Sequence, residues 1–156
     1  MQMHETVKQM WRDYLLSIGQ DIETTDLKYE AWHFCDNEKD ADELAELVCQ
    51  GIKKATTGLL YFYEQENEAL PKPGNLNIVT DWQGKARCVI RTKKVTLLPF
   101  SDVSEEFAYT EGEGDKSLEY WREAHIAAFG RHLDKIGMEF SEDMIVVCEE
   151  FEAVYM

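Results

Sequence analysis

Apolar residues recur at helical spacing in three stretches of the chain. Near the start, Gly19 ends a face that comprises Val7, Met10, Trp11, Tyr14, Leu15 and Ile18. A second face follows a capping pair, Asp40 and Glu43, ends at Gly51, and comprises Ala41, Leu44, Ala45, Leu47 and Val48. A third ends near Gly137 and comprises Leu118, Trp121, His125, Ala128, Phe129, His132 and Ile136. The pattern therefore predicts three amphipathic helices.

Shorter patterns lie between these helices. The alternating aromatic residues of 29–34 suit a short strand or a turn that lines a pocket. Residues 59–68 favour a short helix, which Pro71 ends. The segment 99–115 begins with a proline, contains two glycines and many acidic residues, and we expect it to form a loop.

β-Branched residues concentrate in the middle and at the end of the chain. Residues 76–82 and 86–98 predict a hairpin and its continuation, and residues 144–155 supply a last strand or two. We expect one α+β domain spanning residues 1–156, in which several strands curl into a small barrel. Residues 1–28 would form the N-terminal helix and linker, and residues 29–156 the core.

Charge and cysteine content narrow the classes of function. Sixteen basic and 31 acidic residues give a formal net charge of −15, which repels polyanions and argues against a broad surface for nucleic acid. The four cysteines form no CxxC pair, so we expect reduced thiols rather than a zinc site or a redox pair. No signal peptide or membrane-spanning run is recognisable, so we expect a cytoplasmic protein with no membrane partner.

Lys53 and Thr56 follow the second helix and form the first candidate site. A loop there can direct an ammonium and a hydroxyl into one cavity, where a buried lysine of lowered pKa could activate the hydroxyl. The alternative is a surface lysine beside a threonine that caps the next element. The segment is not a phosphate-binding loop, because Ile52 occupies the position where that loop requires glycine.

Three further groups of residues allow both a functional and a structural interpretation. Glu111-Gly112-Glu113-Gly114-Asp115 can present a carboxylate into a cleft, or can be a solvated turn; its spacing is not that of a calcium loop. His125 and His132 lie on a helix face as packed residues or as acid–base groups. A planar base could stack on a rim formed by Trp32, Phe34, Trp121 and Arg122, although such residues also pack in cores.

A series of short motifs runs in one order along residues 31–151. They are Ala31-Trp32-His33-Phe34, Ala41-Asp42-Glu43-Leu44-Ala45, Gly51-x-Lys53-x-Ala55-Thr56, Pro99-Phe100-x-Asp102-Val103, Phe107-Ala108-x-x-Glu111-Gly112-Glu113-Gly114-Asp115, Ser117-Leu118-x-x-Trp121-Arg122-x-x-His125 and Val147-x-Glu149-x-Phe151. Jointly they resemble the ASCH domain family, and within it a bacterial branch that carries the Glu-Gly-Glu-Gly-Asp loop. The resemblance implies a PUA-like β-barrel with flanking helices, a fold shared with RNA-binding and RNA-modifying modules.

The resemblance also implies a site and an activity. In small relatives, the lysine and threonine of the GxKxxT motif and a later glutamate hydrolyse the amide of N4-acetylcytidine, which places these roles on Lys53, Thr56 and Glu111. Other relatives cleave RNA. The chain departs from the family pattern at Lys54, where a small residue is common, at Cys35, where glycine is common, and at Thr57-Gly58, where many relatives carry an arginine.

Three hypotheses follow. The first is a hydrolase for an acylated nucleoside, with Lys53, Thr56 and Glu111 catalytic and no cofactor or metal. The second is a non-catalytic module that binds short single-stranded RNA, and the third is an enzyme that cleaves RNA. The residues expected to contact the ligand are Trp32, Phe34, Lys54, Thr57, Glu113, Trp121, Arg122 and His125. The sequence leaves open whether Glu111 or Glu113 is the working carboxylate, and it does not indicate an oligomeric state.

Overall fold

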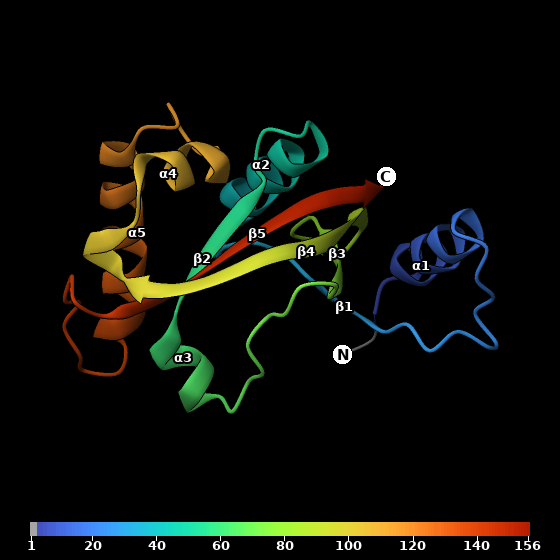
Figure 1. Cartoon of the computed structure of the whole chain (residues 1–156), viewed down its shortest axis with the longest axis horizontal. Coiled ribbons are helices and arrows are strands. Elements are labelled where there is room, and N and C mark those ends of the chain that lie inside the picture. The colour runs from blue at the N-terminus through green and yellow to red at the C-terminus, as the bar shows by residue number, and fades with distance from the viewer. Residues whose placement is uncertain (1–2) are drawn as a thin grey trace.

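A computed structural model describes residues 3–156. The helices are α1 (Glu5–Ser17), α2 (Glu38–Cys49), α3 (Leu60–Gln65), α4 (Glu105–Glu111) and α5 (Leu118–Asp134), with a short 3₁₀ helix, η1 (Phe100–Asp102). The strands are β1 (Tyr29–Trp32), β2 (Ala55–Leu59), β3 (Leu76–Thr80), β4 (Ala86–Pro99) and β5 (Ile145–Tyr155). Figure 1 shows α1 at the opposite end of the molecule from α4 and α5. No helix within the described part is long and apolar enough to cross a membrane.

The five strands form one sheet in the order β1-β3-β4-β5-β2, with β1 parallel to β3 and every other pair antiparallel. Strand β4 pairs with β3 through its first part and with β5 along most of its length. The register of β4 against β5 shifts twice, between Val89 and Ile90 and between Thr92 and Lys94. Such irregularities bend a strand, so one long β4 serves two differently oriented parts of the sheet.

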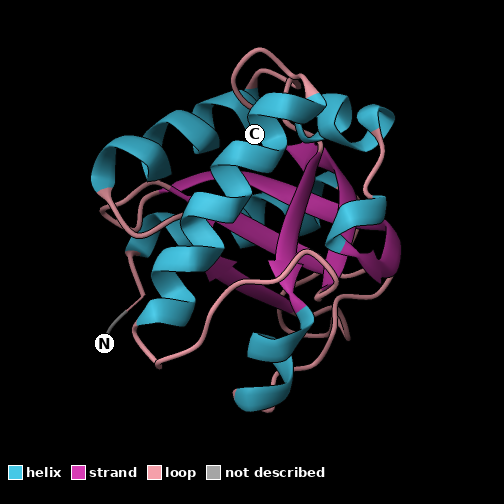
Figure 2. Cartoon of the chain, turned by 90° about the vertical axis from the view of Figure 1, so that its left-hand side faces the viewer, coloured by secondary structure: helices cyan, strands magenta, loops and turns pink. Residues whose placement is uncertain are grey.

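The predicted α+β class with flanking helices is confirmed, and Figure 2 shows the helices arranged around the strands. The predicted barrel is not closed, because within residues 3–156 the edge strands β1 and β2 each pair on one side only. Trp32 at the end of β1 and Thr56 in β2 line one cavity. Side chains and open space, rather than a ladder of hydrogen bonds, therefore lie between the two edges.

Most of the predicted elements are confirmed, and two predictions are wrong. The second helix begins before the expected capping pair, because Asn37 is the N-cap and its side chain accepts a hydrogen bond from Asp40 N at 2.9 Å. The expected loop 99–115 contains helix α4, whose N-cap Ser104 accepts a hydrogen bond from the backbone of Phe107. The last segment, for which one strand or two were expected, is a single strand.

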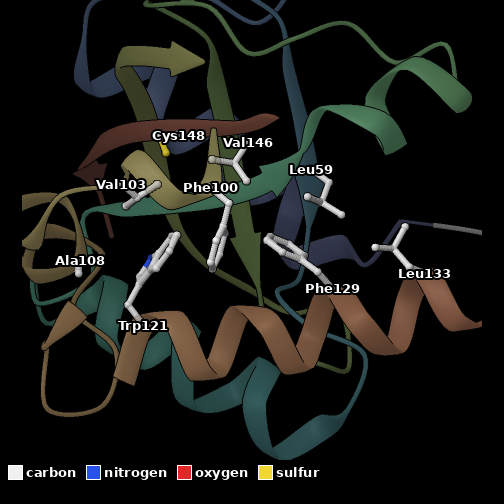
Figure 3. Packing of buried hydrophobic residues seen from close by; sticks show 9 residues of the cluster. All are labelled: Leu59, Phe100, Val103, Ala108, Trp121, Phe129, Leu133, Val146 and Cys148. Atoms are coloured by element: carbon white, nitrogen blue, oxygen red, sulfur yellow. The ribbon is translucent and has the colours of Figure 1, made fainter. Parts of the chain in front are cut away.

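Three apolar clusters hold the helices on the sheet. Helix α1 packs Val7, Trp11, Tyr14 and Leu15 against strands β3 and β4. Phe34 and residues of α2 form a second cluster with strands β3, β4 and β5. In the third cluster Phe100 stands between Trp121 and Phe129 of α5, with ring centroids 5.0 and 6.4 Å away (Figure 3). This last cluster fixes the position of α5, which carries the buried residues Trp121 and His125.

Gly112 allows α4 to end against the segment that precedes β2. Its φ of +74° lies in the left-handed region, and a Cβ placed on it would lie 2.2 Å from the carbonyl oxygen of Ile52. Lys54 N donates a hydrogen bond to Thr110 O at 2.9 Å in the same contact. The end of α4 and residues 52–54 therefore touch through their backbones, which a side chain at position 112 would prevent.

Replacement of Gly112 should destabilise the protein more than replacement of a glycine with the same backbone angle in open space. Gly51 also has φ +74°, but nothing lies within 4 Å of a Cβ built on it. We expect Gly51→Ala to lower the free energy of unfolding by about 1 kcal/mol, because alanine is strained in the left-handed conformation. Gly112→Ala should lower it by about 2 kcal/mol more, because the two backbones must also separate. Urea denaturation of both variants measures the difference, and equal losses would contradict a tight contact at Gly112.

Candidate functional site

Lys53 is a buried cation at the entrance to β2. Helix α2 ends before Gly51, and the following turn directs the side chain of Lys53 inward, where it is 1% exposed. Its ammonium donates hydrogen bonds to Ala55 O at 2.7 Å and to Glu113 Oε2 at 2.8 Å, and lies 3.4 Å from Glu111 Oε2. The ring of Phe34 lies 5.1 Å from the same Nζ atom. Burial disfavours the charge, but the two carboxylates outweigh it and raise the pKa of Lys53.

Glu111, the last residue of α4, is the anion that four donors surround. Its Oε1 accepts hydrogen bonds from Thr57 Oγ1 at 2.8 Å and from Trp121 Nε1 at 2.7 Å. Its Oε2 lies near Lys53 and 3.0 Å from His125 Nε2. Burial opposes ionisation, but the charges of Lys53 and His125 and the hydrogen bond from His125 hold the pKa of Glu111 well below its ordinary value of 4.5.

His125 is placed as an imidazolium. Its Nδ1 lies 2.7 Å from the carbonyl oxygen of Trp121 and its Nε2 lies 3.0 Å from the carboxylate of Glu111. Both partners can only accept a hydrogen bond, so both ring nitrogens must carry a proton. Burial lowers the pKa of His125, but Glu111 outweighs it and raises the pKa above 6.5. Lys53, Glu111, Glu113 and His125 thus form a charge cluster with two cations and two anions.

Glu113 differs from Glu111 in exposure and in proton affinity. Its side chain is 19% exposed and contacts Lys53. Burial and the neighbouring charge of Glu111 raise its pKa, although Lys53 acts in the opposite direction. Ligand atoms of Glu111, Glu113 and His125 lie within 4.8 Å of one another, a spacing that a metal ion could use. The ammonium of Lys53 already contacts both carboxylates, so these residues do not fit a metal unless Lys53 moves away.

Thr56 and Thr57 point to opposite sides of β2, because side chains alternate along a strand. Thr57 faces the charge cluster, and Thr56 lines a cavity of about 590 Å³ between the sheet edges and helix α3. This volume falls in the range of small-molecule sites. Trp32, Phe34 and Tyr63 form aromatic parts of the cavity wall. Tyr63 packs on Gly58, where a Cβ would lie 3.1 Å from its ring.

The structure divides the predicted site residues between two places. Trp32, Phe34 and Thr56 line the cavity. The charge cluster and its hydrogen-bond partners comprise Lys53, Thr57, Glu111, Glu113, Trp121 and His125. Lys54 is exposed, and Arg122 pairs with Glu142 over the ring of Phe100. Lys53 and Glu111 therefore meet, whereas Thr56 does not join them, and Lys54 and Arg122 lie outside both groups.

Sequence reasoning missed Tyr63, Asn77 and Glu149, which also line the cavity. Glu149 has a recognisable signal, because it occupies the same face of β5 as the buried Val147 and Phe151. A carboxylate between two inward-facing apolar residues indicates a cavity or a buried partner. Tyr63 carries no comparable signal, and Asn77, although it stands between Leu76 and Ile78, is an uncharged residue whose position alone does not indicate a cavity.

The sequence model of the ASCH domain family matches residues 30–155 of this chain. The chain belongs to the ASCH domain family. This confirms the resemblance seen in the motifs, and ASCH domains have a PUA-like fold that is often linked to RNA binding.

Solved structures of related proteins agree with this assignment. An ASCH domain from Lactobacillus crispatus JV V101 is 40% identical with a TM-score of 0.90, over 99% of this chain and 97% of that one. A protein from Enterococcus faecalis V583 is 36% identical with a TM-score of 0.86, over 97% of this chain and 89% of that one. A comparison with curated proteins gives no match.

The charged state of His125 should make the stability of the protein depend on pH. Because the folded-state pKa is raised above 6.5, the stabilisation is fully present below about pH 6.5 and is lost as the pH rises through the folded-state pKa. Below about pH 6.5, the free energy of unfolding of the wild type should exceed that of His125→Gln by about 2 kcal/mol. This difference should become smaller as the pH rises through the folded-state pKa of His125. Urea denaturation over this range measures it.

His132→Gln is the matched control, because His132 lies on the same helix with an exposed side chain 3.6 Å from Asp36. It should change the free energy of unfolding by less than about 1 kcal/mol at every pH. A constant difference between wild type and His125→Gln would contradict an imidazolium in the cluster.

Proposed function

We propose that the protein binds a nucleoside-like ligand in the cavity and hydrolyses an acyl amide on its base, as in N4-acetylcytidine. One observation carries this proposal: the hydroxyl-bearing side chain of Thr56 lines an aromatic-walled cavity, and the buried cation Lys53 lies on the other side of the same strand segment. The ammonium of Lys53 donates to the carbonyl oxygen of Ala55, the residue before Thr56. A nucleophile, a wall on which a base can stack, and a nearby positive charge are what the reaction needs.

In this proposal Thr56 Oγ1 forms a bond to the amide carbonyl carbon. The C–N bond breaks, the proton of Thr56 passes to the departing amine nitrogen, and water then hydrolyses the resulting ester to the free acid and Thr56. Lys53 is held protonated by two carboxylates, so it stabilises developing negative charge through its field rather than accepting a proton. Glu111 and Glu113 hold Lys53 in place, and because neither of them lines the cavity they are assigned no proton transfer in this mechanism.

The cavity favours a small neutral ligand over an RNA strand. Its wall carries the carboxylates of Glu30, Glu68 and Glu149 but one basic residue, Lys28. An RNA-binding groove requires cations along the phosphate backbone, and the net charge of −15 opposes the same contact over the whole chain. The RNA-binding and RNA-cleaving alternatives therefore receive less support from the site than hydrolysis of a nucleoside.

Removal of the Thr56 hydroxyl should abolish most of the activity. Wild type should convert N4-acetylcytidine to cytidine and acetate, and Thr56→Ala should lower kcat by at least about 100-fold. Thr56→Ser keeps a hydroxyl and should retain activity within about 10-fold. Chromatographic detection of cytidine measures turnover.

Thr96→Ala provides a matched control, because Thr96 is an exposed threonine of β4 that does not line the cavity. It should leave turnover unchanged. Full activity in Thr56→Ala would exclude Thr56 as the nucleophile. Binding of a short RNA that weakens steeply with salt, without deacetylation by wild type, would instead favour the RNA-binding module.

A further inference from the structure

Glu149 is a buried carboxylate on the cavity wall to which the hydrolytic steps assign no role. It is 7% exposed, and its Oε2 accepts a hydrogen bond from Thr92 Oγ1 at 2.6 Å. Burial raises the pKa of Glu149, while the Thr92 hydroxyl acts in the opposite direction. No cation is paired with Glu149 in the described part of the chain. A carboxylate in this position gains stability from any further donor that enters the cavity.

The sheet places Glu149 directly beside Thr56. The two residues are paired across the antiparallel ladder of β2 and β5, and both line the cavity. Side chains of residues opposed in this way lie within a few ångströms of each other at their Cβ atoms. A ligand group held by Glu149 is therefore held next to the hydroxyl of Thr56.

Asn77 supplies a complementary donor on the same wall. Its Oδ1 accepts a hydrogen bond from Trp32 Nε1 at 2.9 Å, which leaves the amide nitrogen as the group that Asn77 can offer to a ligand. The same bond fixes the indole ring of Trp32, against which a base can stack. The wall thus combines an acceptor, a donor and an aromatic face, as recognition of the edge of a nucleobase requires.

The cavity is unfavourable for phosphate. Glu30 and Glu68 lie on its exposed part, and burial together with the charges of Glu66 and Glu30 raises the pKa of Glu68. Inside, burial and the charge of Glu149 raise the pKa of Tyr63 to about 12. The contribution of the carboxylates to each of these shifts reflects negative potential in or around the cavity, which repels a phosphate and attracts N–H donors.

We propose that Glu149 determines the specificity of the cavity by accepting a hydrogen bond from the exocyclic N–H of a cytosine-type base, and that the ligand is a nucleoside rather than a nucleotide. This inference rests on the proposed function in taking a nucleoside as the ligand. Asn77 donates to the ring acceptor beside that N–H, and Trp32 stacks on the base. When the exocyclic nitrogen is acylated, its N–H on Glu149 places the carbonyl carbon near Thr56, the residue opposite.

Binding of three probes to the chain of residues 1–156 tests the proposal without requiring turnover. The probes are cytidine, N4,N4-dimethylcytidine, which lacks the N–H, and cytidine 5′-monophosphate, with affinity measured by calorimetry or tryptophan fluorescence. Wild type should bind cytidine about 10-fold more tightly than either other probe, since one lost hydrogen bond to a charged group is worth about that factor. Glu149→Gln should bind cytidine about 10-fold more weakly and lose the preference over the dimethylated probe.

Glu150→Gln is the matched control, because Glu150 is the next residue of β5 and its side chain points to the other face of the sheet. It should bind all three probes as wild type does. This result would also show that loss of a negative charge on β5 is not sufficient to weaken the binding of cytidine. Unchanged cytidine affinity in Glu149→Gln, no preference for cytidine over the dimethylated probe in wild type, or absence of cytidine binding would overturn the proposal.

The outcome is separable from that of the hydrolysis assay. Cytidine binding that depends on Glu149 would support this inference even if N4-acetylcytidine remained intact, in which case only the proposed reaction would fail. Deacetylation that depends on Thr56 but not on Glu149 would support the reaction and remove the role of Glu149. Nucleotide binding as tight as nucleoside binding would overturn the exclusion of phosphate.

Discussion

The burial of one ammonium group, that of Lys53, constrains much of the structure. A buried lysine is costly unless carboxylates and hydrogen-bond acceptors replace the water that it loses. Ala55 O, Glu111 and Glu113 supply that replacement, and two of the three come from a segment nearly 60 residues further along the chain. The end of α4 must therefore lie against the start of β2, and the backbone contact at Gly112 allows it to do so.

The same requirement extends to α5. Glu111 compensates Lys53, but its own burial demands further donors, which Thr57, Trp121 and His125 provide. Trp121 and His125 are stacked with ring centroids 4.3 Å apart, and Trp121 also stacks on Phe100 in the apolar cluster. Polar and apolar interactions thus share residues, so the position of the charge cluster and the packing of α5 depend on each other.

Local patterns predicted what local interactions determine. The three amphipathic helices, the hairpin and the short helix after β2 follow from the order of apolar residues. The family motifs named Lys53, Thr56 and Glu111 as one group, of which Lys53 and Glu111 lie together. Helix α4 was missed because its acidic, glycine-containing end resembles a loop. The separation of Thr56 from Lys53 follows from strand alternation, which begins at a position that only the pairing of β2 with β5 defines.

That alternation gives β2 two different environments. One face, through Thr57, belongs to a largely buried cluster of two basic and two acidic residues, and the other, through Thr56, belongs to a cavity whose charged lining is mainly acidic. A balanced cluster has a weak field at long range but a strong one within a few ångströms. Its cation can therefore favour negative charge that develops beside Thr56 without attracting polyanions from solution. The proposed hydrolysis of a nucleoside is compatible with this arrangement, because the net charge of −15 and the acidic lining of the cavity both oppose contact with phosphates.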